Sequence, residues 1–206
     1  HPTQGTLFHD IVRILKKKKP RAFLLENVPG LVTHDNGRTY ETILHTLERE
    51  LRYKVFPWIL DSVDFGVPQS RARLYIVGVF GPDLPDSFLV KPPAKYPKRV
   101  FINKFVEANV SGYSISKHLQ KKYLWKKDDG RPQTINRESR IAVKTLVSTY
   151  HKIQRLTGTF VEDGETGLRL LTENECRASM GFPKWFQIPV SRTQMRSEEH
   201  TSELQS

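Results

Sequence analysis

The chain has 206 residues and a mass of 23.9 kDa, enough for one domain and part of a second. No stretch approaches the roughly 20 consecutive apolar residues that span a bilayer, so an integral membrane protein is excluded and a cytoplasmic location is expected. A single cysteine excludes a disulfide framework and a Cys-rich zinc site, and we expect no metal. The net charge of +11 favours a polyanionic partner, with nucleic acid as the first candidate.

The first 80 residues predict alternating helices and strands. Apolar residues at helical spacing predict a helix over 6–18, ended by Pro20. The continuous apolar run over residues 21–28 predicts a buried parallel strand, and further strands are expected over 53–60 and 74–80. This order is typical of an α/β fold with a mostly parallel sheet. A second helix after residue 37 is indicated by one apolar face, formed by Tyr40, Ile43, Leu44, Leu47 and Leu51.

Beyond Gly81 the chain becomes proline-rich and irregular, which predicts a domain boundary. We expect residues 1–85 to form one domain and residues 86–168 a second, smaller one. Order returns with Thr172-x-x-Glu175, a capping box that starts a short helix. Cys176 and Met180 are expected to pack inward from this helix, so that Cys176 is a core thiol and not a nucleophile.

The positive charge is concentrated between residues 91 and 155, which carry 16 basic and 4 acidic side chains, a net charge of +12. Bases and aromatics alternate there, most clearly in KKYLWKK, residues 121–127. A solvated lysine-rich surface would explain this composition, but it is also typical of a surface that follows nucleic-acid phosphates. The candidate phosphate-binding residues are Lys121, Lys122, Lys126 and Lys127.

Polar residues stand at the ends of two predicted strands. Glu26 and Asn27 end the first strand, at the sheet edge where open α/β folds bind ligands, and a carboxyl group there could donate a proton. Gln69, Arg71 and Arg73 enter the last strand at alternate positions, so an extended chain would place them on one face, suited to an anion or a nucleobase. A turn cap would also explain the first pair, and surface salt bridges would explain the arginines.

Three segments resemble, in this order, the conserved blocks of the cytosine-5 DNA methyltransferases. GTLFHDIVRILKKKKPRAFLLENVPGLVTHDNGRT, residues 5–39, resembles the fifth and sixth blocks. DFGVPQSRARLYIVGV, residues 64–79, is similar to the eighth, and RLLTENECRASMGFP, residues 169–183, to the ninth. The resemblance implies an α/β fold: part of a Rossmann-like S-adenosylmethionine-dependent methyltransferase sheet plus a smaller, irregular target-recognition domain, which would occupy residues 86–168.

The resemblance also implies the activity. Such an enzyme transfers a methyl group from S-adenosylmethionine to carbon 5 of a cytosine flipped out of duplex DNA, within a bacterial restriction–modification system. By resemblance Glu26 would protonate ring nitrogen 3, Asn27 would brace the loop, and Arg71 and Arg73 would hold the base carbonyl and nearby backbone. Gln69 and the dipeptide Thr145-Leu146, which resembles one in the family's recognition domains, would contact DNA. We expect a monomer that is paired functionally with a restriction endonuclease.

Other parts of the family pattern are expected outside this sequence. The Pro-Cys dipeptide that carries the nucleophile and the glycine-rich cofactor loop would precede His1, so no cofactor-binding residue is assigned and the chain alone is expected to be inactive. Residues 169–195 would return toward the catalytic domain, and RSEEHTSELQS, residues 196–206, resembles a translated sequencing adapter. Two alternatives remain: a non-catalytic double-stranded DNA-binding module, and another α/β enzyme with a small anionic ligand.

Overall fold

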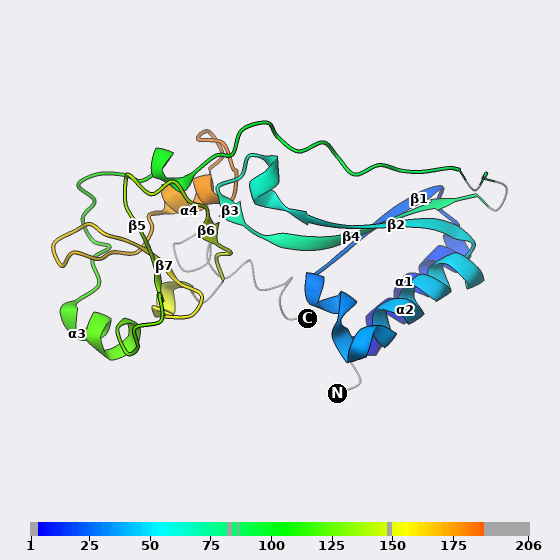
Figure 1. Cartoon of the computed structure of the whole chain (residues 1–206), viewed down its shortest axis with the longest axis horizontal. Helices are drawn as coiled ribbons and strands as arrows, with labels where there is room; N and C mark the ends of the chain where they lie inside the picture. Colours follow the sequence, from blue (N-terminus) through cyan, green and yellow to red (C-terminus); the bar gives the residue numbers. More distant parts are fainter. Residues whose placement is uncertain (1–3, 82–83, 86, 148–149, 188–206) are drawn as a thin grey trace. The chain divides into compact units, whose positions relative to one another are not determined.

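A computed structural model describes residues 4–81, 84–85, 87–147 and 150–187 (Figure 1). The chain divides into two compact units. Within the described residues, the first unit contains the chain up to Leu60 and Ala72–Ala94, and the second contains Asp61–Arg71 and the described residues after Ala94. The functional division at residues 86 and 169 stays a prediction, and the expected adapter-derived tail lies outside the described residues.

The first unit is a three-stranded sheet, of order β1-β4-β2, with two helices on one face (Figure 1). The helices and strands expected in this region are confirmed. Apolar side chains of both helices pack with Tyr53, Leu74 and Ile76 in a single core cluster. The elements are α1 (Gln4–Lys18), β1 (Ala22–Asn27), α2 (Arg38–His45), β2 (Tyr53–Asp61) and β4 (Ala72–Phe80).

The expected pairing and burial of the first strand are wrong. β1 runs antiparallel to β4, from Ala22 opposite Val79 to Asn27 opposite Leu74. Its residues alternate between exposed and half-buried, and Leu24 is 62% exposed. β1 lies at one edge of the described sheet, and the helices cover only one face of that sheet, so the other face of β1 is exposed. A continuous apolar run in the sequence does not reveal that only one face is covered.

The stretch from Gln69 to Arg73 is not one extended strand. Gln69–Ser70 form a short strand, β3, which pairs in parallel with β6 (Val143–Lys144) in the second unit, and β4 begins only at Ala72. Arg71 separates the two strands. The expectation that all three side chains share one face assumed a single strand, and that assumption is wrong because β3 pairs with a segment of the second unit and not within the sheet of β4.

The second unit has the short, irregular elements expected from the sequence. Apart from β3 and β6, one other parallel pair is described, between β5 (Gln133–Ile135) and β7 (Thr159–Val161). Its helices are α3 (Lys117–Leu119), which continues into a π-helical turn over Gln120–Leu124, and α4 (Glu173–Ser179). The predicted capping box is confirmed: the Thr172 hydroxyl accepts from Glu175 N, and the Glu175 carboxylate accepts from Thr172 N.

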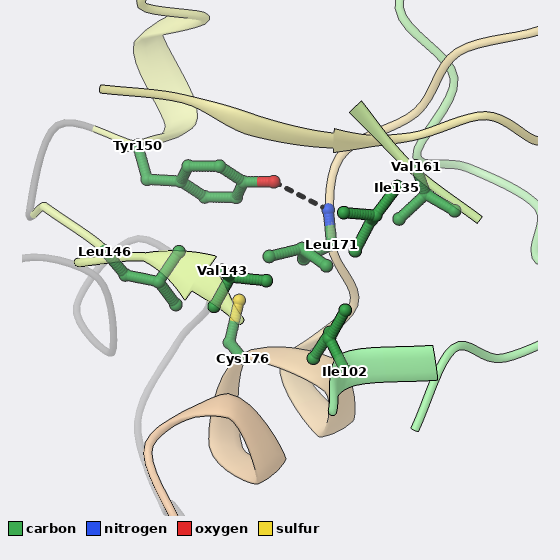
Figure 2. Packing of buried hydrophobic residues seen from close by; sticks show 8 residues of the cluster. All are labelled: Ile102, Ile135, Val143, Leu146, Tyr150, Val161, Leu171 and Cys176. Carbon is green, nitrogen blue, oxygen red and sulfur yellow. Dashed lines mark hydrogen bonds between the residues drawn. The ribbon is translucent and has the colours of Figure 1, made fainter. Parts of the chain in front are cut away.

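The core of the second unit joins distant segments (Figure 2). The Tyr150 hydroxyl accepts a hydrogen bond from Leu171 N at 2.9 Å and donates one to Thr159 O at 2.6 Å. Cys176 is 3% exposed in this cluster, which confirms it as a core thiol. Met180 is 36% exposed, so its expected inward packing is wrong. The reason is that α4 ends at Ser179, and Met180, four residues after the buried Cys176, no longer continues the helix face that Cys176 belongs to.

A buried arginine lies next to this core. Arg169 is 0% exposed and binds Glu175 through Nη1 and Nη2 at 2.8 and 2.9 Å, and Asp163 through Nε at 3.2 Å. Its Nη2 also donates to Glu107 O at 3.0 Å. The ninth block thus ties three segments of the second unit together through one guanidinium.

The same network makes a pH dependence of stability testable. The backbone N–H of Gly164, and after it the Arg169 guanidinium, hold the pKa of Asp163 below its ordinary value. A carboxyl group whose pKa is lowered on folding stabilises the folded state above its unfolded pKa, and this contribution is lost as the pH falls. Asp163→Asn is therefore expected to flatten the pH dependence of the unfolding midpoint below about pH 4. An unchanged slope in denaturant titrations across that window would contradict this role.

Two further observations concern the described residues alone. None of their helices combines the length and apolar character needed to cross a bilayer. In the same part of the chain, no cluster of three or more His, Cys, Asp or Glu side chains is arranged to hold a metal ion.

Candidate active site

The first unit brings Glu26 and Arg73 together. Arg73 Nε lies 2.9 Å from Glu26 Oε1. The pairing register explains the contact: Glu26 lies opposite Tyr75, and Arg73, two residues before Tyr75, is its diagonal neighbour on the same face of the sheet. Long side chains reach across that diagonal. The structure therefore brings these two predicted site residues into contact, and their catalytic roles stay a prediction.

The surroundings of the pair suit a group that binds a ligand. Arg73 is only 13% exposed, and its Nη1 donates to Ala72 O at 2.8 Å, so the guanidinium is fixed. The Glu26 side chain is 46% exposed, so its carboxyl group is accessible. A fixed cation beside an accessible carboxyl group can orient it toward a polar ring.

Asn27 stabilises the turn after β1. Its Oδ1 accepts a hydrogen bond from Val28 N at 2.8 Å, immediately before the 3₁₀ turn over Pro29–Val32. Asn27 points to the half-buried side of the strand, whereas Glu26 points to the exposed side. This bond is compatible with the bracing role that the family resemblance implies for the asparagine, and that role stays a prediction.

A second polar group lies within the second unit. Gln69 is 2% exposed, and its Nε2 is buried without a hydrogen-bond partner among the described residues. Arg71 Nη1 is in the same situation. Buried donors are normally paired, so these two groups are available to an acceptor that the described residues do not supply.

The predicted recognition dipeptide is split between two roles. Thr145 Oγ1 donates to Ser70 O at 2.9 Å, directly after the β3–β6 pairing, so Thr145 lies beside the Gln69–Arg71 segment. Leu146 is 5% exposed and belongs to the core cluster of Figure 2. Its side chain therefore packs in the core, and it is too buried to make the predicted contact with DNA.

The four lysines are exposed, as a phosphate-binding surface requires. They follow α3, where Leu124 is 0% exposed and anchors the turn in a small core cluster. Tyr123 and Trp125, on either side of it, are 41% and 49% exposed. The ammonium groups of Lys122 and Lys126 lie 5.2 and 6.0 Å from the Tyr123 ring centroid. The composition of KKYLWKK indicated this surface, but only the fold shows which aromatic side chains remain accessible.

Sequence comparison relates the chain to bacterial methyltransferases. It is 58% identical over 195 residues to the type II methyltransferase M.MspI of a Moraxella species, covering 95% of this chain and 46% of that protein. It is 54% identical over 195 residues to the type II methyltransferase M.BsuFI of Bacillus subtilis, covering 95% of this chain and 47% of that protein. The chain thus spans about half the length of the curated relatives it matches.

Structural comparison confirms the methyltransferase fold. The methyltransferase EhMeth of Entamoeba histolytica superposes with a TM-score of 0.70 at 20% identity, covering 96% of this chain and 63% of that one. The Dnmt2 methyltransferase of S. pombe superposes with a TM-score of 0.67 at 19% identity, covering 92% of this chain and 65% of that one. The family model for C-5 cytosine-specific DNA methylases matches residues 1–199. The chain belongs to the C-5 cytosine-specific DNA methylase family.

Proposed function

We propose that the protein methylates carbon 5 of a flipped cytosine in duplex DNA, with S-adenosylmethionine as the methyl donor. The observation that carries this proposal is the Glu26–Arg73 ion pair, which lies in two of the blocks that the family resemblance identified. The similarity to two type II methyltransferases supports a place beside a restriction endonuclease. The proposal includes a monomeric protein in the cytoplasm.

The chemistry assigned to this pair is ring polarisation. A proton shared between ring nitrogen 3 and the Glu26 carboxylate withdraws electron density from the cytosine, so that carbon 6 accepts a nucleophile. Arg73 orients the carboxyl group, and we assign to it a contact with the base carbonyl. Cys176 cannot be that nucleophile, since it is buried in the core of the second unit.

The cofactor site is not assigned to this chain's residues. S-adenosylmethionine supplies the methyl group when bound, and the family's cofactor loop is rich in glycine. Among the described residues, no glycine-rich loop follows a strand, so they do not fit that part of the site.

The exposed lysines are proposed to bind DNA phosphates. Changing Lys121, Lys122, Lys126 and Lys127 to glutamine is expected to lower the salt dependence of duplex binding by about one unit of log–log slope for each lysine that binds a phosphate. The ranking of DNA sequences should stay the same, because side chains that bind phosphates do not read bases. Fluorescence anisotropy over a salt series measures both quantities.

A charge-matched control is available in the first unit. The exposed lysines of the Lys16–Lys19 run lie at the carboxyl end of α1, where positive charge stabilises the helix without any ligand. Changing them to glutamine should therefore leave the salt dependence of DNA binding nearly unaltered. Equal effects of the two quadruple variants would contradict a defined phosphate-binding surface and would indicate that only the net charge matters.

Methyl transfer itself is tested in a chimera. The 195 matching residues of this chain replace their counterparts in M.MspI, and transfer of a labelled methyl group from S-adenosylmethionine to duplex DNA is measured. We expect incorporation above that of the M.MspI part alone. DNA binding without incorporation, by a chimera that folds, would favour a non-catalytic DNA-binding module.

A further inference from the structure

Asp61, at the end of β2, binds three groups with one carboxylate. Its Oδ1 accepts from Arg71 N at 2.8 Å and from Val63 N at 3.2 Å, and its Oδ2 accepts from the Ser70 hydroxyl at 2.9 Å. The bond to Val63 N caps the 3₁₀ turn that follows β2. The other two bonds reach the segment that carries Gln69 and Arg71, eight to ten residues further along the chain.

The backbone of this segment is held from two other directions. On one side, Ser62 Oγ donates to Gln69 O at 2.6 Å, and Ser62 N donates to Arg71 O at 3.3 Å. On the other side, Thr145 Oγ1 donates to Ser70 O at 2.9 Å. Three consecutive carbonyl groups and the Arg71 N–H therefore have fixed partners. A backbone that is restrained at each residue holds its side chains in defined directions.

This restrained backbone carries the side chains of Gln69 and Arg71, which hold the two unpaired donors. Gln69 Nε2 and Arg71 Nη1 are buried and have no acceptor among the described residues. Both groups only donate hydrogen bonds, so the missing partner is an acceptor, and DNA offers phosphate oxygens, base carbonyl oxygens and ring nitrogens. All of these residues belong to the second unit, so the frame and the donors it carries form one body.

We propose that Asp61 is a positioning residue that aligns Gln69 and Arg71 with acceptor atoms of bound DNA. This inference rests on the proposed methyl transfer. It assigns Asp61 no contact with the substrate; its carboxylate acts through the Arg71 and Ser70 groups that it binds. A purely structural alternative is that Asp61 only caps the turn after β2.

Kinetics of the chimera separate these two roles. Asp61→Ala is expected to lower kcat by about 10- to 100-fold, the effect of displacing a positioned group by about 1 Å. Asp61→Asn should stay within about threefold of the unchanged chimera, because its Oδ1 still accepts from Arg71 N and Val63 N, and the Ser70 hydroxyl can rotate to accept from the amide. Asp10→Ala, which removes an aspartate from an exposed ion pair, is the matched control and should leave kcat unchanged.

The decisive comparison is a double-mutant cycle with Arg71→Ala. If Asp61 acts through Arg71, Asp61→Ala has little further effect on kcat in the Arg71→Ala background. Losses that multiply overturn the proposal, and so does an Asp61→Asn variant as slow as Asp61→Ala. Should Asp61→Ala fail to fold, Ser70→Ala can replace it, because this change removes only the hydrogen bond to Asp61 Oδ2. Ser70→Ala must then lower kcat by a smaller factor, and this loss must vanish in the Arg71→Ala background. An inactive unsubstituted chimera would instead refute the proposed function.

Discussion

Glu26→Gln in the chimera is expected to slow methyl transfer by about 100-fold or more while DNA affinity changes by less than about threefold. The substitution keeps the size and the hydrogen-bonding reach of the side chain, but an amide cannot release a proton to ring nitrogen 3. The Glu26 side chain is half exposed and its only described ion pair is with Arg73, so folding should be little affected. Single-turnover rates with labelled S-adenosylmethionine, together with binding titrations on the same DNA, separate the two effects.

The matched control for this change is Glu41→Gln. Glu41 is an exposed acid in the first turn of α2, in the same unit as Glu26. Its change to glutamine should leave the rate of methyl transfer unchanged. Parallel losses of rate and DNA affinity in Glu26→Gln would contradict the account, because they would show that the carboxylate supports the fold and not the reaction.

Arg169→Ala is expected to lower the free energy of unfolding of the second unit by about 3–5 kcal/mol. The substitution leaves the carboxylate of Glu175, which is 0% exposed, without the guanidinium that binds both of its oxygens. It also removes the donor to Glu107 O. Leaving one buried charge without its partner costs far more free energy than the intact pair contributes to stability, so the expected effect is large.

Arg13→Ala provides the reference for this prediction. Arg13 pairs with Asp10, and both side chains are more than half exposed, so its loss should change stability by about 0.5 kcal/mol or less. Urea denaturation followed by tryptophan fluorescence measures both variants. A second check is the double variant Arg169→Met with Glu175→Leu, which should be less destabilised than Arg169→Ala; equal or greater destabilisation would contradict the assigned cause.

The helices and strands of the first unit follow from local patterns, but their pairing does not. Periodicity predicted α1 and α2 and located each strand to within about two residues, because apolar spacing directly reflects which positions are buried. The direction of β1 relative to β4 depends on contacts between residues about 50 positions apart, and no local pattern carries it. The break at Arg71 arises in the same way, since β3 exists only by pairing with β6.

The candidate site shows the same division. Glu26 and Arg73 could be named because each stands in a recognisable block, and the structure joins them. Asp61 could not be singled out, since an aspartate at the end of a strand is most simply explained as a cap, and its bonds to Ser70 and Arg71 depend on how the chain returns. Arg169 likewise lies in the ninth block, but nothing local shows that it is fully buried between two acids.

The most direct test of the central claim is to identify the product of the chimera by mass spectrometry of digested duplex DNA. We expect 5-methyl-2′-deoxycytidine as the only new nucleoside, in amounts that depend on this chain's Glu26 and that the M.MspI part does not produce alone. A folded chimera that binds DNA yet forms no 5-methylcytosine, or forms as much with Glu26→Gln, would contradict the claim that the Glu26–Arg73 pair holds the target base.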